Sequence, residues 1–187
     1  MAQPQMLDKI ELVRTKGVLY DTLFLPENMP HEISNMFVIP VGCYAGRKIK
    51  EREHTNMQIC GCLPCPEKFG VRGIKCGFYQ GGERIDPLWG TLTLQIGLRK
   101  ITTFPLPEIW HPSCRSLTYH ERHRYAEEFL ELEDKNNPIV ATIETMEYFT
   151  CILELPKKPD IPTDFLAVIF GDHFVSETSL PPFTDHY

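Results

Sequence analysis

Four of the seven cysteines of this chain lie within 17 residues, in the stretch ICGCLPCPEKFGVRGIKC. They are Cys60, Cys62, Cys65 and Cys76, and their spacing is C-x-C-x2-C-x10-C. A two-residue gap lets the thiolates of Cys62 and Cys65 reach one tetrahedral zinc ion from a tight turn. Cys76, together with either Cys60 or His54, would complete the ligand set. The spacing therefore predicts a structural zinc site, and zinc is the one cofactor that the sequence indicates.

Two other interpretations of these cysteines stay open. Cys60 and Cys62 alternate by one residue, so on a strand they face the same side, which suits packing of buried thiols as well as metal binding. The CLPC segment is typical of dithiol redox motifs, in which a helix N-terminus activates the thiolate. The residues after Cys65 do not begin an amphipathic helix, so the sequence disfavours the redox interpretation.

A second group of chemistry-bearing residues lies in EIWHPSCRSLTYHERHRYAEE and comprises His111, Cys114, His120 and His123. On a helix, His120 and His123 would share one face, and His111 with Cys114 could pair as base and thiol nucleophile. However, the interleaved arginines are typical of a solvated helix face, and no third group orients the pair. A small metal- or thiol-dependent enzyme built on these residues is the alternative hypothesis, and we assign no catalytic residue.

Three aromatic residues, Trp89, Trp110 and Tyr187, are the candidates for contact with a partner. Each tryptophan stands beside turn residues, in PLWG and EIWHP, where an indole can cap the end of a curved sheet or anchor an interface. Core packing is the first interpretation for both tryptophans. Tyr187 ends a stretch that follows two adjacent prolines, and it is either a frayed terminus or a tail that adds to a partner's sheet edge.

The elements that must position these residues are mostly strands. Alternation of apolar and polar residues is clearest in TLTLQIGL, with Leu92, Leu94, Ile96 and Leu98 on one face, and in FTCILEL. Further β-branched or aromatic runs of strand length are GVLYDTLFL, NMFVIPV, NPIVATIE and DFLAVIF. The glycines of GFYQGGERIDPLWG fit neither a dinucleotide fingerprint nor a phosphate loop, and they predict a β-turn at Gln80 to Gly82.

One segment carries a helical signal, from about Thr118 to Lys135. Thr118 and Glu121 fit a capping box, apolar residues follow at helical spacing, and Asn136 begins the stop signal. Strands, one helix and more strands do not alternate as in a doubly wound parallel sheet. We therefore predict an α+β fold, with a mainly antiparallel, curved sheet or partly open barrel covered by a helix at about residues 118–135. Residues 1–175 would form one globular domain, and residues 176–187 an extended or mobile tail.

Composition narrows the classes of function. With 187 residues, 42% hydrophobic and 24% charged, the chain matches an ordinary globular domain. No apolar stretch is long enough to cross a bilayer and no secretory signal is visible, so we expect a cytoplasmic protein, with the nucleus as the alternative. The net charge of −6 disfavours nucleic acid as the partner, and the mixed patch of Arg47, Lys48, Lys50 and Arg52 is diluted by glutamates.

These observations favour a non-catalytic, intracellular protein-interaction module of the adaptor or accessory type, such as an antagonist of another protein. Its partner would be a protein rather than a membrane or a nucleic acid. No set of nucleophile, base and orienting group stands out, whereas prolines, aromatics and loops are plentiful. The sequence points to residues 47–76 as the place where a specific function should be sought first.

Overall fold

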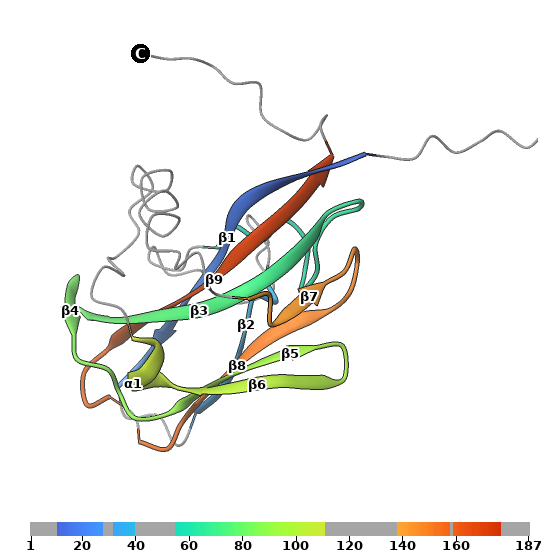
Figure 1. The fold of residues 1–187 in the computed structure, drawn as a ribbon. Coiled ribbons are helices and arrows are strands. Elements are labelled where there is room, and N and C mark those ends of the chain that lie inside the picture. The colour runs from blue at the N-terminus through green and yellow to red at the C-terminus, as the bar shows by residue number, and fades with distance from the viewer. Residues whose placement is uncertain (1–10, 28–31, 40–54, 111–137, 158, 177–187) are drawn as a thin grey trace, which may run out of the picture.

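The computed structural model of the protein describes residues 11–27, 32–39, 55–110, 138–157 and 159–176 (Figure 1). Within these ranges the chain forms nine strands and one four-residue helix. Every pairing between the strands is antiparallel, and the strands divide into two sheets. The fold of the described chain is therefore a two-layered β-structure.

The larger sheet has the order β1-β9-β3-β4, and β7 pairs with β3 off this path. Its strands are β1 (Leu12–Leu25), β3 (Lys68–Gln80), β4 (Glu83–Ile85), β7 (Ala141–Ile143) and β9 (Thr163–Ser176). β1 and β9 pair along their whole length of 14 residues. The sheet thus joins one end of the described chain to the other, as the long blue and red strands of Figure 1 show.

The smaller sheet has the order β2-β8-β5-β6. Its strands are β2 (Glu32–Met36), β5 (Thr91–Ile96), β6 (Arg99–Pro105) and β8 (Phe149–Leu155), and the short helix α1 (Leu106–Ile109) directly follows β6. The predicted inner faces of β5 and β8 are confirmed, because Leu92, Leu94 and Ile96 of β5 and Phe149, Cys151, Leu153 and Leu155 of β8 are buried. Leu98 is the exception, since its side chain is 100% exposed.

A tight turn explains the position of Leu98. Ile96 and Arg99 are paired residues, so only Gly97 and Leu98 connect β5 to β6. Gly97 has a φ of 58°, as a two-residue hairpin with glycine at its first loop position requires. The alternation therefore ends at Ile96. The predicted turn after Gln80 is confirmed in the same way, with Gly81 and Gly82 at φ values of 60° and 90°.

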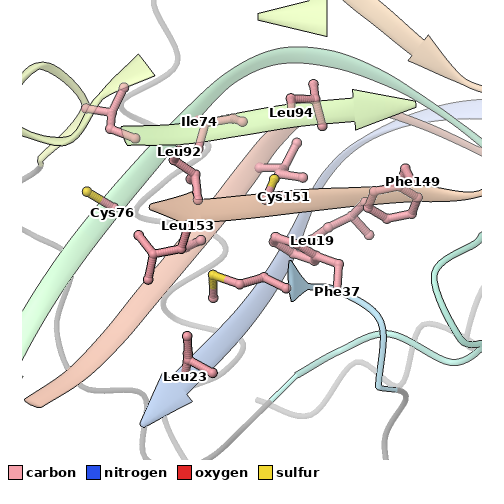
Figure 2. Packing of buried hydrophobic residues seen from close by; sticks show 14 of the residues in the cluster. Leu19, Leu23, Phe37, Ile74, Cys76, Leu92, Leu94, Phe149, Cys151 and Leu153 are labelled. Atoms are coloured by element: carbon pink, nitrogen blue, oxygen red, sulfur yellow. The ribbon is translucent and has the colours of Figure 1, made fainter. Parts of the chain in front are cut away.

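Side chains of both sheets meet in one apolar core (Figure 2). Leu19, Ile74 and Cys76 of the larger sheet face Leu94 and Leu153 of the smaller one, and the rings of Phe37 and Phe149 lie 5.9 Å apart. Burial of each large apolar side chain stabilises the folded state by about 1.5–3 kcal/mol. Contact between the two inner faces therefore holds the layers together.

The predicted α+β fold is wrong for the described chain. Most of it is strand, the strands form two sheets instead of one curved sheet or open barrel, and no described helix covers a sheet. The segment expected to be a helix, residues 118–135, lies outside the described residues. Alternation identifies a strand but not the sheet that it joins, which is why the division into two layers was not foreseen. Ser176 of the predicted tail ends β9, and the rest of that tail is outside the described part.

Candidate protein-binding site

The four predicted zinc ligands do not gather in one place. Cys76 lies on β3 with its side chain in the core, and its Sγ is 3.7 Å from the carbonyl oxygen of Leu106. Cys60 and Cys65 are exposed in the segment that precedes β3, whereas Cys62 is buried there. Across the described residues, no three Cys, His, Asp or Glu side chains form a group that could hold a metal ion. The geometry therefore gives the predicted zinc site no support.

The buried thiols are also poorly suited to redox or nucleophilic chemistry. Burial raises the pKa of the Cys62 thiol, and the neighbouring Cys60 raises it further. Burial raises the pKa of the Cys151 thiol far more strongly, with the charge of Asp21 adding to the effect. Thiol chemistry needs the thiolate, so a raised pKa keeps these two groups in their inert, protonated form at neutral pH.

The histidine group cannot be placed in the fold. His111, Cys114, His120 and His123 all lie outside the described residues, and so does the mixed basic patch within residues 47–52. The enzyme hypothesis built on the first group consequently stays a prediction.

No helix within the described ranges has the length and hydropathy of a membrane span.

The two tryptophans have different surroundings. Trp110 packs against the core, its buried indole Nε1 has no hydrogen-bond partner among the described residues, and the guanidinium of Arg84 lies 5.2 Å from its ring centroid. Trp89, in the connection between β4 and β5, is 80% exposed. Core packing therefore fits Trp110, and only Trp89 has the exposure that a partner contact needs. Tyr187 lies outside the described residues.

A groove that the sequence did not predict opens between the edges of the two sheets, and we call it the edge groove. Its volume is about 400 Å³. Ile96, Arg99 and Ile101 of the β5–β6 hairpin line one wall. Residues 140–142, with Glu144 and Glu147, line the other wall. The groove therefore joins segments that are about forty residues apart in the chain.

The two walls of the edge groove differ in character. Arg99 and Ile101 are alternate residues of β6, so one side-chain face of this strand borders the groove. On the opposite wall three consecutive residues, 140–142, border it. Val140 directly precedes β7, and Ala141 and Thr142 are its first two residues. Neighbouring residues of a strand point to opposite faces, so a groove that both of them line runs along the backbone edge of the strand. β7 pairs with β3 on its other side, and no described strand pairs with this edge.

Five exposed apolar residues lie within or directly next to the two chain segments that line the edge groove. We call them the apolar rim: Leu98, Ile139, Val140, Met146 and Tyr148. Leu98 is at the tip of the β5–β6 hairpin, and the amide of its neighbour Gly97 donates to the carbonyl oxygen of Tyr148 at 2.7 Å. The hairpin tip and the β7–β8 connection are thus held side by side.

Backbone hydrogen bonds fix the β7–β8 connection in place. The amide of Met146 donates to the carbonyl oxygen of Leu63 at 3.2 Å. The amide of Glu147 donates to the carbonyl oxygen of Glu144 at 3.0 Å. The hydroxyl of Thr145 lies 2.9 Å from the carbonyl oxygen of Glu67. The exposed side chains on this connection are therefore carried by an ordered backbone.

The charges around the edge groove are unevenly matched. Glu144 forms an ion pair with Lys68 at 2.6 Å, and Oε2 of Glu147 accepts a hydrogen bond from the amide of Glu144 at 3.1 Å. Within the described chain, Arg99 has no ion-pair or hydrogen-bond partner. Arg99 is therefore the charged residue of the groove that lacks any polar partner in the described chain, whereas Glu147 is held by a backbone amide.

Comparisons with protein-family models, with curated proteins and with solved structures give no match. The site is therefore described by its own structure. It lies in a two-sheet β-structure, beside a strand edge that no described strand pairs, and exposed apolar side chains are found on the neighbouring segments. One sequence signal could have revealed part of this site. Gly97 within TLTLQIGL marks a hairpin turn, and recognising it would have moved Leu98 from the core to the surface.

Proposed function

We propose that the protein is a non-catalytic, intracellular interaction module of the adaptor or accessory type, and that it binds another protein through the apolar rim. The observation that carries this proposal is the exposure of five large apolar side chains on the two neighbouring chain segments that form one groove. Clustered apolar exposure marks interaction surfaces, because isolated exposed residues are common but a gathered patch leaves a large apolar area in water.

The order of the rim supports the same function. The hairpin tip and the β7–β8 connection are joined by the bond from Gly97 to Tyr148, so binding need not immobilise two separate loops. Ordering of loops and side chains is one of the main costs of association. A rim that is already held in place therefore leaves more of the free energy of apolar burial for affinity.

Substitution of the rim tests this function. The double variant Leu98→Asp with Met146→Asp places two charges on the rim, and Ile161→Asp is the matched control because Ile161 is exposed but outside the rim. We expect the double variant to lose at least about tenfold in affinity for a protein captured from cell extract, since burying one such charge costs more than about 1.4 kcal/mol.

The measurement is quantitative affinity capture followed by titration of the purified captured protein against each variant. Ile161→Asp should bind within about twofold of the unmodified protein, and all variants should keep the same circular dichroism spectrum, because exposed substitutions change stability by about 0.5 kcal/mol or less. Equal binding by the double variant and the unmodified protein would show that the rim is not the interaction surface.

A further inference from the structure

The proposed function leaves open what lies in the edge groove, and the following inference rests on that function. We propose that the groove takes one extended strand of the partner protein, which pairs with the free edge of β7 and places a carboxylate beside Arg99. Three properties of the groove lead to this occupant: a backbone edge that no described strand pairs, an apolar wall and one charged side chain without a polar partner.

The backbone edge is the first property. β7 pairs with residues Phe69 to Val71 of β3, and on its other side, where no described strand pairs with it, Ala141 and Thr142 of β7 border the groove together with the preceding Val140. An open edge presents unpaired amide and carbonyl groups, which an incoming strand can satisfy. Addition of a strand to such an edge is an established way to recognise an extended peptide, with the main chain supplying affinity and alternate side chains supplying specificity.

The apolar wall is the second property. Ile96 and Ile101 face the groove from the β5–β6 hairpin, across from the edge of β7. Alternate residues of a strand point to the same side, so a strand lying along β7 would direct every second side chain toward these isoleucines. A volume of about 400 Å³ is at the lower end of the range for ligand sites, and it suits a few side chains of one strand.

The unpartnered guanidinium is the third property. Glu144 is engaged by Lys68 and Glu147 accepts a hydrogen bond from a backbone amide, so among the described charged residues of the groove it is Arg99 that has no polar partner. A guanidinium binds a carboxylate through two parallel hydrogen bonds. The partner strand should therefore carry Asp or Glu at the position that faces Arg99.

The test uses a defined probe, a phage-displayed library of random dodecapeptides selected on the full-length protein. The enriched peptides should share alternating apolar residues and an acidic residue. A synthetic version of one of them is then N-methylated at every second residue, in each of the two registers. Fluorescence anisotropy should show at least about a tenfold loss of affinity in one register and little change in the other, because only one set of amides faces β7.

Charge reversal tests the role of Arg99 with a control from the adjacent residue. Arg99→Glu should weaken binding of the acidic peptide by at least about tenfold, and replacing the peptide's acidic residue with Lys should restore it. Lys100→Glu makes the same change of charge at a residue that is exposed but does not line the groove, so binding should stay within about twofold.

Four results would overturn the inference. They are the absence of any enriched peptide, equal binding by both N-methylated registers, no effect of Arg99→Glu, and self-association of the protein that Leu98→Asp abolishes. The last would mean that a second copy of the chain occupies the groove. Capture of a partner that depends on the apolar rim could still succeed in each case, so failure of strand addition is distinguishable from failure of the proposed function.

Discussion

Replacement of Asp172 by asparagine should destabilise the fold strongly at neutral pH. Asp172 lies on β9 with only 2% of its side chain exposed, and its Oδ2 accepts hydrogen bonds from Nη2 of Arg72 at 2.8 Å and of Arg14 at 2.9 Å. An asparagine side chain at this position would be neutral. Arg72, of which 16% is exposed, would then keep its charge but lose the charge of Asp172 that lies against it.

The magnitude follows from the burial of the two arginines. Removing one member of a buried ion pair costs about 3–5 kcal/mol, because the remaining charge is left uncompensated. The pair with Arg14 adds little, since 59% of the Arg14 side chain is in water and exposed pairs contribute about 0.2–1 kcal/mol. Because Arg72 keeps some contact with solvent, we expect Asp172→Asn to lower the free energy of unfolding by about 2–4 kcal/mol.

The effect should depend on pH in one direction. Burial on its own would raise the pKa of Asp172, but hydrogen bonds from Arg72 and Arg14, together with their charges, outweigh it and hold the pKa below its ordinary value. The stabilisation is therefore complete above the unfolded-state pKa of about 3.9 and is lost as the pH falls through the lower, folded-state pKa. The unmodified protein and Asp172→Asn should approach each other in stability below about pH 4.

Urea denaturation at several pH values between about 3 and 7, followed by circular dichroism, measures this difference. Arg14→Met should lower the free energy of unfolding by less than about 1 kcal/mol, whereas Arg72→Met should lower it by about as much as Asp172→Asn. In the double variant Arg72→Met with Asp172→Asn, the loss should differ from the sum of the two single losses by at least about 1 kcal/mol. Equal effects of the two arginine variants, or a loss in Asp172→Asn that is the same at both ends of the pH range, would refute the reasoning.

Two further predictions concern residues that the sequence singled out. Trp110→Ala should lower the free energy of unfolding by at least about 2 kcal/mol because it leaves a cavity beside the core, whereas Trp89→Ala should change it by less than about 0.5 kcal/mol; thermal unfolding distinguishes the two. Cys76→Ser should cost about 1–3 kcal/mol because it places a hydroxyl in the core, and it should do so equally with and without a chelator. A loss that appears only without chelator, together with zinc in the purified protein, would instead support the four-cysteine site.

Local patterns in the sequence were enough to find several of the strands and one turn, although β3 and β6 were not among the predicted runs. The alternation in FTCILEL predicts the buried face of β8, and the adjacent glycines after Gln80 predict the hairpin between β3 and β4. Both are properties of neighbouring residues: side chains alternate along a strand, and glycine adopts positive φ at little cost. For the same reason the pattern failed at Leu98, where the strand had already ended.

The candidate site could not be found in this way. The cysteines attracted attention through their spacing, yet Cys76 belongs to the core and Cys60 to the surface. The edge groove depends instead on Arg99 and Ile101 lying opposite residues 140–142. Nothing in either segment indicates the other, because neither contains a motif and both look like ordinary strand ends.

By itself, the sequence determined that this protein is rich in strands and which faces of the most regular of them are buried. Only the tertiary structure decided how the strands divide into two sheets, which edges stay open and which apolar side chains remain in water. The physical reason is that periodicity is set by bonds along the chain, whereas sheet partners and edges are set by contacts between residues far apart in it. The edge groove arises from those distant contacts, and so does the function that we propose for it.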